Sequence, residues 1–364
     1  MRICLIITGL GMGGAENQVV NLADAFCAQG HTVLLIVLTG EALVLPKDIR
    51  VRVVLLRSRK TPRSLLGAYL KARRIIKNFS PTVVHSNMIH ANIFARILRL
   101  TTPIPRLVCT AHSTNEGGFL RTLAYNLTDR LADISTNVSN EAVACYIKKR
   151  AVGSGRMITM YNGIDTNKYL FSPYLRASVR NELSLSDGTR VVLAVGRLNE
   201  EKDFPNLLRA FETLLKDGYN CILLIAGAGP LGKKLSAFAY ELGISERVHF
   251  LGIRNDVPAL MSAADLFVLS SRYEGFGLVV AEAMACGRIV VATDCGGVAE
   301  VVGDAGYLVP SRDSDALAKG METALSMPIN LHDRMAVCAR NRIVEMYSLT
   351  AISARWIELY KGIV

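Results

Sequence analysis

Two carboxylates, Glu274 and Glu282, stand eight positions apart in the segment Ser271-Arg-Tyr-Glu-Gly-Phe-Gly-Leu-Val-Val-Ala-Glu282. The apolar run before this segment predicts a buried parallel strand, and residues 278–286 predict a helix. The glycines at this turn let the backbone approach a ligand and direct helix N–H groups at an anion. A phosphate would repel both carboxylates, so they are better suited to accept hydrogen bonds from hydroxyl groups. Phosphate beside a polyhydroxylated ring indicates a sugar nucleotide as the ligand.

A second charged segment, Gly196-Arg-Leu-Asn-Glu-Glu-Lys-Asp203, follows the first strand expected in the second half of the chain. Arg197 and Lys202 are therefore expected at the carboxyl end of a sheet, where open α/β folds bind ligands. Two cations at this place would neutralise a diphosphate, most strongly as it departs with growing negative charge. The alternative is a pair of surface cations that only balance Glu200 and Glu201.

Apolar runs alternate with helical patterns along the whole chain, which predicts an α/β fold with parallel sheets covered by helices on both faces. Apolar residues make up 51% of the 364 residues, enough for two domains. The expected strands of the first half are Ile3–Thr8, Val33–Leu38, Val51–Leu56, Val83–His85, Leu107–Ala111, Ile134–Val138 and Met157–Met160. Those of the second half are Val191–Val195, Cys221–Ala226, Val248–Leu251, Leu266–Leu269 and Ile289–Ala292.

The segment from Glu274 to Glu282 resembles the E-G-F-G-x-x-x-x-E signature of family 4 glycosyltransferases, which are retaining enzymes of the GT-B fold. The resemblance implies two Rossmann-like, doubly wound domains that face each other across a cleft, with a C-terminal helix that crosses back to the N-terminal domain. It implies that Glu274 faces the donor sugar and that Glu282 holds the ribose. Gly196, Arg197 and Lys202 are similar to the family's G-R-x-x-x-x-K motif, whose cations grip the donor diphosphate.

Further motifs extend the resemblance into the first half of the chain. Gly13, Gly14 and Glu16 match a G-G-x-E loop that closes over the donor phosphates and the acceptor. The family places a histidine at the end of the strand that here precedes His112, and its side chain touches the donor sugar. Asn162 begins an N-G-I/V-D turn at the cleft floor. For His112 the alternative is a purely structural histidine. For Asn162 the alternative is a type I′-like turn made by Asn-Gly, without a role in ligand binding.

The nucleoside is expected to contact the second domain. Gly227 and Gly229 follow a strand and would lie under the nucleoside, and Phe250-Leu-Gly-Ile-Arg254 is similar to the family's F-x-G segment, which makes Ile253 and Arg254 candidates for contacts to the base. The residues Gly275, Phe276, Gly277 and Leu278 complete the expected donor site. Asp313-Ser-Asp315 looks like a metal-binding D-x-D motif, but its position at the start of a helix predicts capping aspartates.

One glycine pattern competes with this interpretation. Gly9, Gly11 and Gly14 also satisfy the dinucleotide fingerprint G-x-G-x-x-G between a strand and a helix. An NAD(P) enzyme would need an acidic residue at the end of the second strand, and the nearest one, Glu41, comes late. An oxidoreductase would also leave the charged residues of the second half without a task.

The charge is unevenly distributed. Residues 1–165 contain 21 Lys and Arg against 9 Asp and Glu, whereas residues 166–364 contain 21 against 22. Much of the excess lies between Arg50 and Lys77, with few aromatic residues and no nucleic-acid motif, so nucleic acid is not the expected partner. An anionic membrane surface fits better, at roughly 1 kcal/mol per basic residue. The alternative is a solvated basic face without a partner.

The eight cysteines lack a C-x-x-C pair, and the six histidines have no ligand spacing, so the sequence predicts a reducing cytoplasm and no metal site. No apolar run reaches the roughly 18–20 residues that span a bilayer, and Met1–Thr8 is expected to be a strand rather than a signal peptide. The expected domains are residues 1–170 together with the helical end 347–364, which bind the acceptor, and residues 171–346, which bind the nucleotide sugar.

The resemblance thus implies a retaining hexosyl- or N-acetylhexosaminyltransferase, and the two cations predict that it is metal-independent and needs no cofactor. Its donor is expected to be a UDP-sugar, with a GDP-sugar as the alternative. The expected acceptor is a polyprenyl-diphosphate-linked or other oligosaccharide at the cytoplasmic face of the plasma membrane, as in the bacterial O-antigen and capsule transferases that the chain resembles. The other two classes left open are an NAD(P)-dependent oxidoreductase and a catalytically silent subunit with a GT-B shape.

Overall fold

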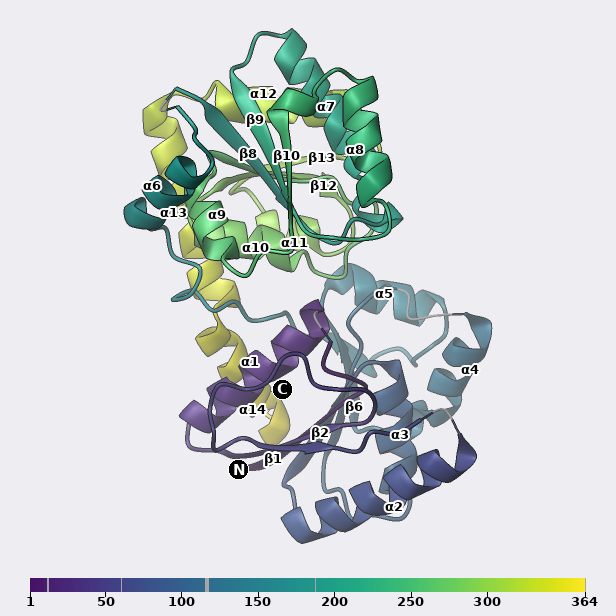
Figure 1. Ribbon diagram of the computed structural model, residues 1–364. Helices are drawn as coiled ribbons and strands as arrows, with labels where there is room; N and C mark the ends of the chain where they lie inside the picture. The colour runs from purple at the N-terminus through teal and green to yellow at the C-terminus, as the bar shows by residue number, and fades with distance from the viewer. Residues whose placement is uncertain (12, 60, 115–117, 187, 364) are drawn as a thin grey trace. The chain divides into compact units, whose positions relative to one another are not determined.

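The structure, a computed structural model, describes residues 1–11, 13–59, 61–114, 118–186 and 188–363. It consists of two compact units (Figure 1). One unit contains Met1–Gly163 and the residues from Leu349 onward, and the other contains Ile164–Ser348. The boundaries expected from the sequence, after residues 170 and 346, differ from these bounds by seven and two residues.

The first unit is built on a seven-stranded sheet in which every pairing is parallel, in the order β3-β2-β1-β4-β5-β6-β7. Its strands are β1 (Arg2–Ile7), β2 (Thr32–Val37), β3 (Arg52–Leu55), β4 (Val83–Asn87), β5 (Leu107–Thr110), β6 (Ile134–Asn137) and β7 (Met157–Thr159). The strand order reverses direction between β1 and β4, which is the point where doubly wound sheets bind ligands.

Helices cover both faces of this sheet. They are α1 (Gly14–Ala28), α2 (Pro62–Phe79), α3 (Ile89–Arg99), α4 (Phe119–Thr128), α5 (Asn140–Lys148) and α14 (Leu349–Lys361), with a 3₁₀ turn at Asp129–Leu131. The C-terminal helix α14 packs beside α1 on one face, as expected from the sequence. His85 of β4 anchors α14 there, because its ring stacks on Trp356 at 4.4 Å and its Nδ1 lies 2.6 Å from the Tyr360 hydroxyl.

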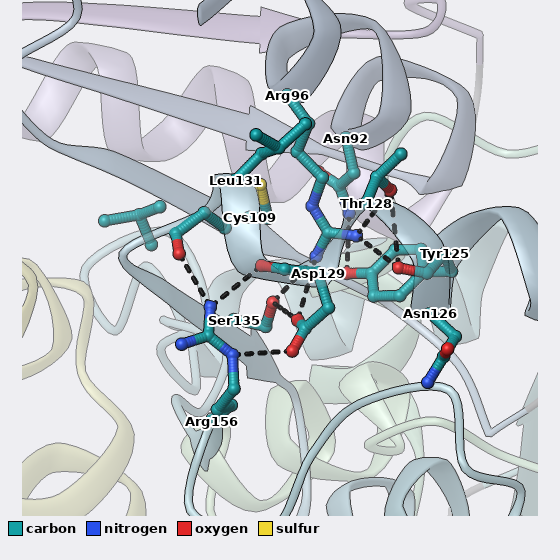
Figure 2. Close-up of polar contacts among 12 residues, drawn as sticks. Asn92, Arg96, Cys109, Tyr125, Asn126, Thr128, Asp129, Leu131, Ser135 and Arg156 are labelled. Atoms are coloured by element: carbon teal, nitrogen blue, oxygen red, sulfur yellow. Dashed lines mark hydrogen bonds and ion pairs between the residues drawn. The ribbon is translucent and has the colours of Figure 1, made fainter.

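The opposite side of the first unit contains a buried charge cluster (Figure 2). The guanidinium of Arg96 is fully buried over the ring of Tyr125, and it donates hydrogen bonds to Tyr125 O at 2.9 Å and to Ser135 Oγ at 2.9 Å. Asp129 is buried between Arg96, at 3.5 Å, and Arg156, at 2.6 Å. Each buried charge is therefore paired and hydrogen-bonded, which is the condition for burying ions without a large loss of stability.

The second unit has a six-stranded sheet, again with only parallel pairings, in the order β10-β9-β8-β11-β12-β13. The strands are β8 (Arg190–Val195), β9 (Cys221–Ala226), β10 (Val248–Gly252), β11 (Leu266–Leu269), β12 (Ile289–Asp294) and β13 (Tyr307–Pro310). The helices are α6 (Pro173–Glu182), α7 (Phe204–Lys216), α8 (Gly232–Glu241), α9 (Val257–Ala263), α10 (Leu278–Ala285), α11 (Val298–Val302), α12 (Ser314–Leu325) and α13 (Ile329–Arg342). Shorter turns lie at Glu200–Lys202, Ser245–Arg247 and Ile343–Tyr347.

The twelve strands expected from the sequence are all present, with ends that differ by at most two residues. The sequence analysis missed β13, a four-residue edge strand that pairs only with β12 and ends in Pro310. Proline weakens a strand pattern and is tolerated at sheet edges, which explains the omission. Asp313 caps α12 by accepting a hydrogen bond from Ala316 N at 2.8 Å, as expected from its position.

One alternative interpretation of a local motif, the type I′-like turn at Asn162-Gly163, is wrong. A type I′ turn needs positive φ at both central residues, but neither Asn162 nor Gly163 has a positive φ. Gly163 is instead close to α14, because a Cβ atom on it would lie 3.0 Å from the Cα of Leu349. Gly163 therefore packs against α14, and the Asn-Gly pair does not form a hairpin-type turn.

Candidate active site

The charged loops of the second unit meet at one place in its sheet. Strands β8 and β11 are neighbours at the point where the strand order reverses, so the loops that follow them lie side by side. The loop after β8 contains Gly196, Arg197 and Lys202, and the loop after β11 contains Glu274. The sequence separates Lys202 from Glu274 by 72 positions, and the sheet topology brings them together.

Lys202 and Glu274 are in direct contact. The Nζ atom of Lys202 forms an ion pair with Oε1 of Glu274, and Ser271 Oγ donates a hydrogen bond to the same oxygen at 2.8 Å. The two side chains remain 20% and 13% exposed. Each group is therefore oriented by the other and still open to solvent on one side, where a ligand could reach both.

Arg197 differs from Lys202 in that it is exposed and its side chain makes no hydrogen bond or ion pair with the described residues. Its guanidinium is therefore available to an anion. Gly196, beside it, leaves room for the Lys202 stem, because a Cβ atom at Gly196 would lie 3.3 Å from Cε of Lys202.

The glycine pair after β9 permits a close approach of two loops. A Cβ atom at Gly227 would lie 1.9 Å from Gly196 O, and one at Gly229 would lie 2.4 Å from Leu198 O. Both contacts are far inside van der Waals distance, so only glycine fits at either position. The loop after β9 is thus pressed against the loop that contains Arg197.

Glu282 lies on α10, eight residues after Glu274, and it is partly buried. Burial raises the pKa of its carboxyl to about 7, and a hydrogen bond with the Tyr169 side chain opposes that rise. Burial, followed by the nearby Glu282 charge, raises the pKa of the Tyr169 hydroxyl, which keeps it protonated as a donor. The Arg340 guanidinium donates to the carbonyls of Tyr169, at 3.2 Å, and Ala285, which ties the Tyr169 segment to α10.

Other predicted donor contacts have different surroundings. Gly275 and Gly277 belong to the turn before α10, and Gly277 has the left-handed φ of +89°. The ring of Phe276 is buried, with its centroid 5.5 Å from that of Tyr347, so only its backbone remains for a ligand. Leu278 is the first residue of α10.

The two candidates for contacts to the base follow β10. Ile253 is 65% exposed, as a side chain that covers a ligand ring would be before binding. Arg254 is held by two carboxylates, Glu182 at 2.7 Å and Asp256 at 2.6 Å. These ion pairs fix the direction of the Arg254 side chain.

The candidates of the first unit lie on the loops that follow β1 and β5. Gly13 caps α1 and Gly14 is its first residue. The Glu16 carboxylate folds back over this turn, because a Cβ atom at Gly13 would lie 2.3 Å from Glu16 Oε2. The N-terminus of α1 is thereby occupied by a carboxylate of its own helix.

His112 follows β5, and its Nε2 lies 3.0 Å from Oδ1 of Asn87 at the end of the neighbouring strand β4. Burial lowers the pKa of His112 to about 4, so the ring is neutral at physiological pH. Asn162 is buried at the end of the first unit. The structure thus collects one set of candidates at the carboxyl edge of each sheet.

The sequence analysis missed four residues that organise the second set: Ser271, Asp203, Arg272 and Tyr169. Asp203 directly follows Lys202 and Arg272 precedes Glu274 by two residues, so the charge of both residues was a usable signal. Nothing in the sequence marks Ser271 or Tyr169, because their partners, Glu274 and Glu282, are found only in the folded chain.

Comparisons with known proteins agree with this architecture. The sequence-family model called "Glycosyl transferases group 1" matches residues 176–342, and the family model called "Glycosyltransferase Family 4" matches residues 12–168. The crystal structure of Anabaena Alr3699/HepE in complex with UDP superposes with a TM-score of 0.86 over 100% of both chains, at 23% identity. The chain is a member of glycosyltransferase family 4 and has the GT-B fold.

Two curated relatives are informative by name. The GDP-mannose-dependent alpha-(1-6)-phosphatidylinositol monomannoside mannosyltransferase of Mycolicibacterium smegmatis is 31% identical over 71% of this chain and 70% of its own. The N-acetylgalactosamine-N,N'-diacetylbacillosaminyl-diphospho-undecaprenol 4-alpha-N-acetylgalactosaminyltransferase of Campylobacter jejuni is 25% identical over 89% of this chain and 90% of its own. Other relatives match over about half of their length, 53% and 52% in two cases.

Proposed function

We propose that this protein is a retaining glycosyltransferase. It transfers a hexosyl or N-acetylhexosaminyl group from a nucleoside-diphosphate sugar to a saccharide acceptor in the synthesis of a cell-surface polysaccharide or glycolipid. The observation that carries the proposal is the contact between Lys202 and Glu274 at the strand-order reversal of the second unit, with the exposed Arg197 on the same loop as Lys202. A cation and an acid that share one solvent-facing place suit a ligand with both phosphate and hydroxyl groups.

In this mechanism the acceptor hydroxyl attacks the anomeric carbon from the side on which the diphosphate departs. The bond from the anomeric carbon to the phosphate oxygen breaks, the new glycosidic bond forms on the same face, and the departing phosphate oxygen takes the acceptor proton. Arg197 and Lys202 stabilise the developing phosphate charge, so that no metal is needed. Glu274 holds the sugar, with His112 as a further contact, and Glu282 holds the ribose.

A UDP-sugar is the first choice of donor, and a GDP-sugar is the alternative. The complex of Alr3699/HepE with UDP supports the first, and the name of the M. smegmatis relative supports the second. In either case Gly227, Gly229, Ile253 and Arg254 contact the nucleoside, and the backbone of residues 275–278 contacts the phosphates and the sugar. In the first unit, Gly13, Gly14, Glu16 and Asn162 are the further proposed ligand contacts.

The dinucleotide alternative is disfavoured by the carboxylate at the first glycine loop. Glu16 lies over Gly13 at the N-terminus of α1, where a dinucleotide would place its pyrophosphate, and two negative groups at that distance repel each other. The glycosyltransferase proposal differs in that Arg197 and Lys202 of the second unit hold the donor diphosphate. Glu41 does not end a strand either, because β2 stops at Val37. The remaining rival is a catalytically silent GT-B subunit.

The acceptor is proposed to be lipid-linked, as the names of both curated relatives indicate for those proteins. Helix α2 supplies a surface for the bilayer that carries such an acceptor. Its exposed residues Arg63, Leu66, Leu70, Arg74 and Lys77 follow one another at spacings of three or four and form one stripe. No acidic residue occurs between Asp48 and Glu116, so no carboxylate from this part of the chain offsets the basic charge.

Basic side chains interleaved with exposed leucines are the pattern of a helix that lies on an anionic membrane. Among the described residues, no helix combines the length and apolarity that crossing a bilayer requires. The eight cysteines are free thiols, which agrees with a cytoplasmic location on the inner face of the plasma membrane.

The decisive experiment is a thermal-shift screen of the purified protein against UDP-sugars, GDP-sugars and nicotinamide cofactors. A sugar nucleotide at about 100 times its Kd should stabilise the protein by about 2.7 kcal/mol. Stabilisation by NAD(P) and by no sugar nucleotide would overturn the proposal. Transfer of radiolabelled sugar from that donor to a polyprenyl-diphosphate acceptor then tests the reaction.

Two variants separate the remaining alternatives. Glu274→Ala should retain donor binding and lose turnover, whereas unchanged biological function in this variant would favour the silent subunit.

Leu66→Ser/Leu70→Ser should weaken binding to vesicles that contain an anionic lipid. Equal activity on soluble and lipid-linked acceptors, without an effect of anionic lipid, would remove the membrane part of the proposal.

A further inference from the structure

We infer that Asp203 and Arg272 form a positioning pair that holds Lys202 and Glu274 in register. Both residues adjoin the candidate site without belonging to its predicted ligand contacts. Asp203 directly follows Lys202, and Arg272 precedes Glu274 by two residues. The inference rests on the proposed function, since it assigns a task to residues that support the proposed donor site.

The pair has the geometry of a strong, specific contact. Arg272 Nε lies 2.7 Å from Oδ2 of Asp203, and its Nη2 lies 2.8 Å from Oδ1. Two parallel N–H···O bonds of this kind fix the relative orientation of the two groups as well as their distance. Asp203 is buried, with 3% of its surface exposed, so solvent screens the interaction weakly.

The backbone of Asp203 shows that the contact has a cost. The residue has a φ of +47° and a ψ of +46°, a left-handed conformation that favours glycine. Asp203 precedes α7 at the N-cap position, where an aspartate usually accepts a hydrogen bond from the helix backbone, but its side chain makes no capping bond. Its carboxylate is therefore used for Arg272 instead of for the helix.

Two further hydrogen bonds join the same loops, one at the residue before Lys202 and one at Lys202 itself. Arg272 N donates to Glu201 O at 2.7 Å, and Ser270 Oγ donates to Lys202 O at 2.8 Å. The segments 201–203 and 270–274 are consequently connected at residues 201, 202 and 203. Such a connection leaves little freedom for the backbone from which the Lys202 side chain extends toward Glu274.

The charge balance has a consequence for the ligand. Arg272 is 37% exposed beside the site, but its charge is neutralised by Asp203. Arg272 therefore positions other side chains and is not an additional phosphate ligand. Among the described residues of the two loops, Arg197 is the cation whose side chain has no acidic partner. Loss of Arg272 should misplace Lys202 and Glu274 and leave the buried Asp203 carboxylate without its partner.

The test compares Arg272→Ala and Arg272→Lys with a matched control, Arg176→Ala. Arg176 pairs with Asp265 at 2.7 Å in the same unit, next to the opposite, amino end of β11. We expect Arg272→Ala to lower kcat/KM for the donor at least tenfold and to leave KM for the acceptor unchanged. Arg272→Lys, which keeps the charge but loses the two-point geometry, should be intermediate. Arg176→Ala should lower the Tm and leave kcat/KM for the donor within twofold of wild type.

A double-mutant cycle separates positioning from direct contact. If Arg272 acts through Lys202, Arg272→Ala should have little further effect in a Lys202→Ala background. Additive losses of donor affinity would show that Arg272 contacts the donor itself and would overturn the inference.

Hydrogen exchange supplies a readout that does not depend on activity. Amides of residues 200–204 and 270–275 should exchange faster in Arg272→Ala, while those of β11 keep their protection. Unchanged exchange in both loops would contradict the positioning role even if the protein proves to be a glycosyltransferase. Faster exchange in a protein that binds no sugar nucleotide would refute the proposed function and leave the loop contact standing.

Discussion

Gly296 lies directly against the backbone of Glu274: a Cβ atom on Gly296 would be 1.8 Å from the Glu274 carbonyl oxygen. Gly296 also has a left-handed φ of +59°. The loop after β12 therefore packs against the backbone of the loop after β11 at Glu274, the residue whose carboxylate contacts Lys202. No side chain fits at this point, so the position of Glu274 depends on a glycine that is 22 residues away in sequence.

Substitution of Gly296 should lower stability by more than the cost of placing another residue in a left-handed conformation. Gly296→Ala combines a left-handed backbone with a steric clash, and we expect it to lower the free energy of unfolding by more than about 2 kcal/mol and to abolish turnover. Gly287→Ala is the control, since Gly287 has a similar φ of +63° but its nearest atom would be 3.6 Å away. It should cost only about 1–2 kcal/mol and retain donor binding. Equal losses in both variants would disprove the clash.

The two candidate cations should respond differently to removal. Lys202→Ala takes away the partner of a partly buried carboxylate, so we expect lower stability and a decrease in kcat of about 10²–10³-fold. Arg197→Ala removes an exposed side chain, so the Tm should stay constant while donor binding weakens. Chemical denaturation and steady-state kinetics on both variants check this contrast. A large stability loss in Arg197→Ala would show that its side chain has a structural partner.

Donor affinity should depend on pH through Glu282. Burial raises the pKa of its carboxyl to about 7, and an ionised carboxylate is the better acceptor for ribose hydroxyls. If only the ionised form binds, the affinity should increase about tenfold between pH 6 and pH 8. Calorimetric titration with the donor measures this, and Glu282→Gln should flatten the profile. A wild-type affinity that is constant over this range would count against the role of Glu282.

The same group links stability to pH with the opposite sign. The folded protein binds the Glu282 proton more tightly than the unfolded chain, whose carboxyl has an ordinary pKa of 4.5. The contribution of Glu282 to stability is therefore largest below pH 4.5, falls as the pH rises toward 7 and then levels off. Urea denaturation of wild type and Glu282→Gln across this range isolates the contribution.

The buried cluster of the first unit should matter for folding and not for donor binding. Arg96→Ala leaves the buried Asp129 with one fewer cation and removes several hydrogen bonds, so we expect a loss of about 3–5 kcal/mol. The nearby ion pair between Arg99 Nη1 and Asp133 Oδ2, 2.9 Å apart, is more exposed to solvent. Arg99→Ala should therefore cost no more than about 1 kcal/mol of ion-pair energy. Denaturation by urea compares the two. Similar losses of unfolding free energy in Arg96→Ala and Arg99→Ala would mean that the burial of an ion pair does not determine its contribution to stability here.

The strand positions and the placement of the motifs at strand ends were predictable from local patterns. Runs such as Cys221–Ala226 are apolar because both faces of a parallel strand are covered, and glycines or charges follow where the chain turns. The candidate residues Arg197, Lys202 and Glu274 were found in this way. The edge strand β13 escaped because four residues ending in proline carry too little of that pattern.

The sequence by itself determined which residues are available at the carboxyl edge of each sheet, because hydrophobic periodicity and turn chemistry act over short distances along the chain. Only the tertiary structure decided which of them meet. The order of the strands, set by the packing of the whole sheet, puts β8 next to β11 and so joins Lys202 to Glu274 and Asp203 to Arg272. These contacts link residues about 70 positions apart, at distances over which the sequence carries no local signal.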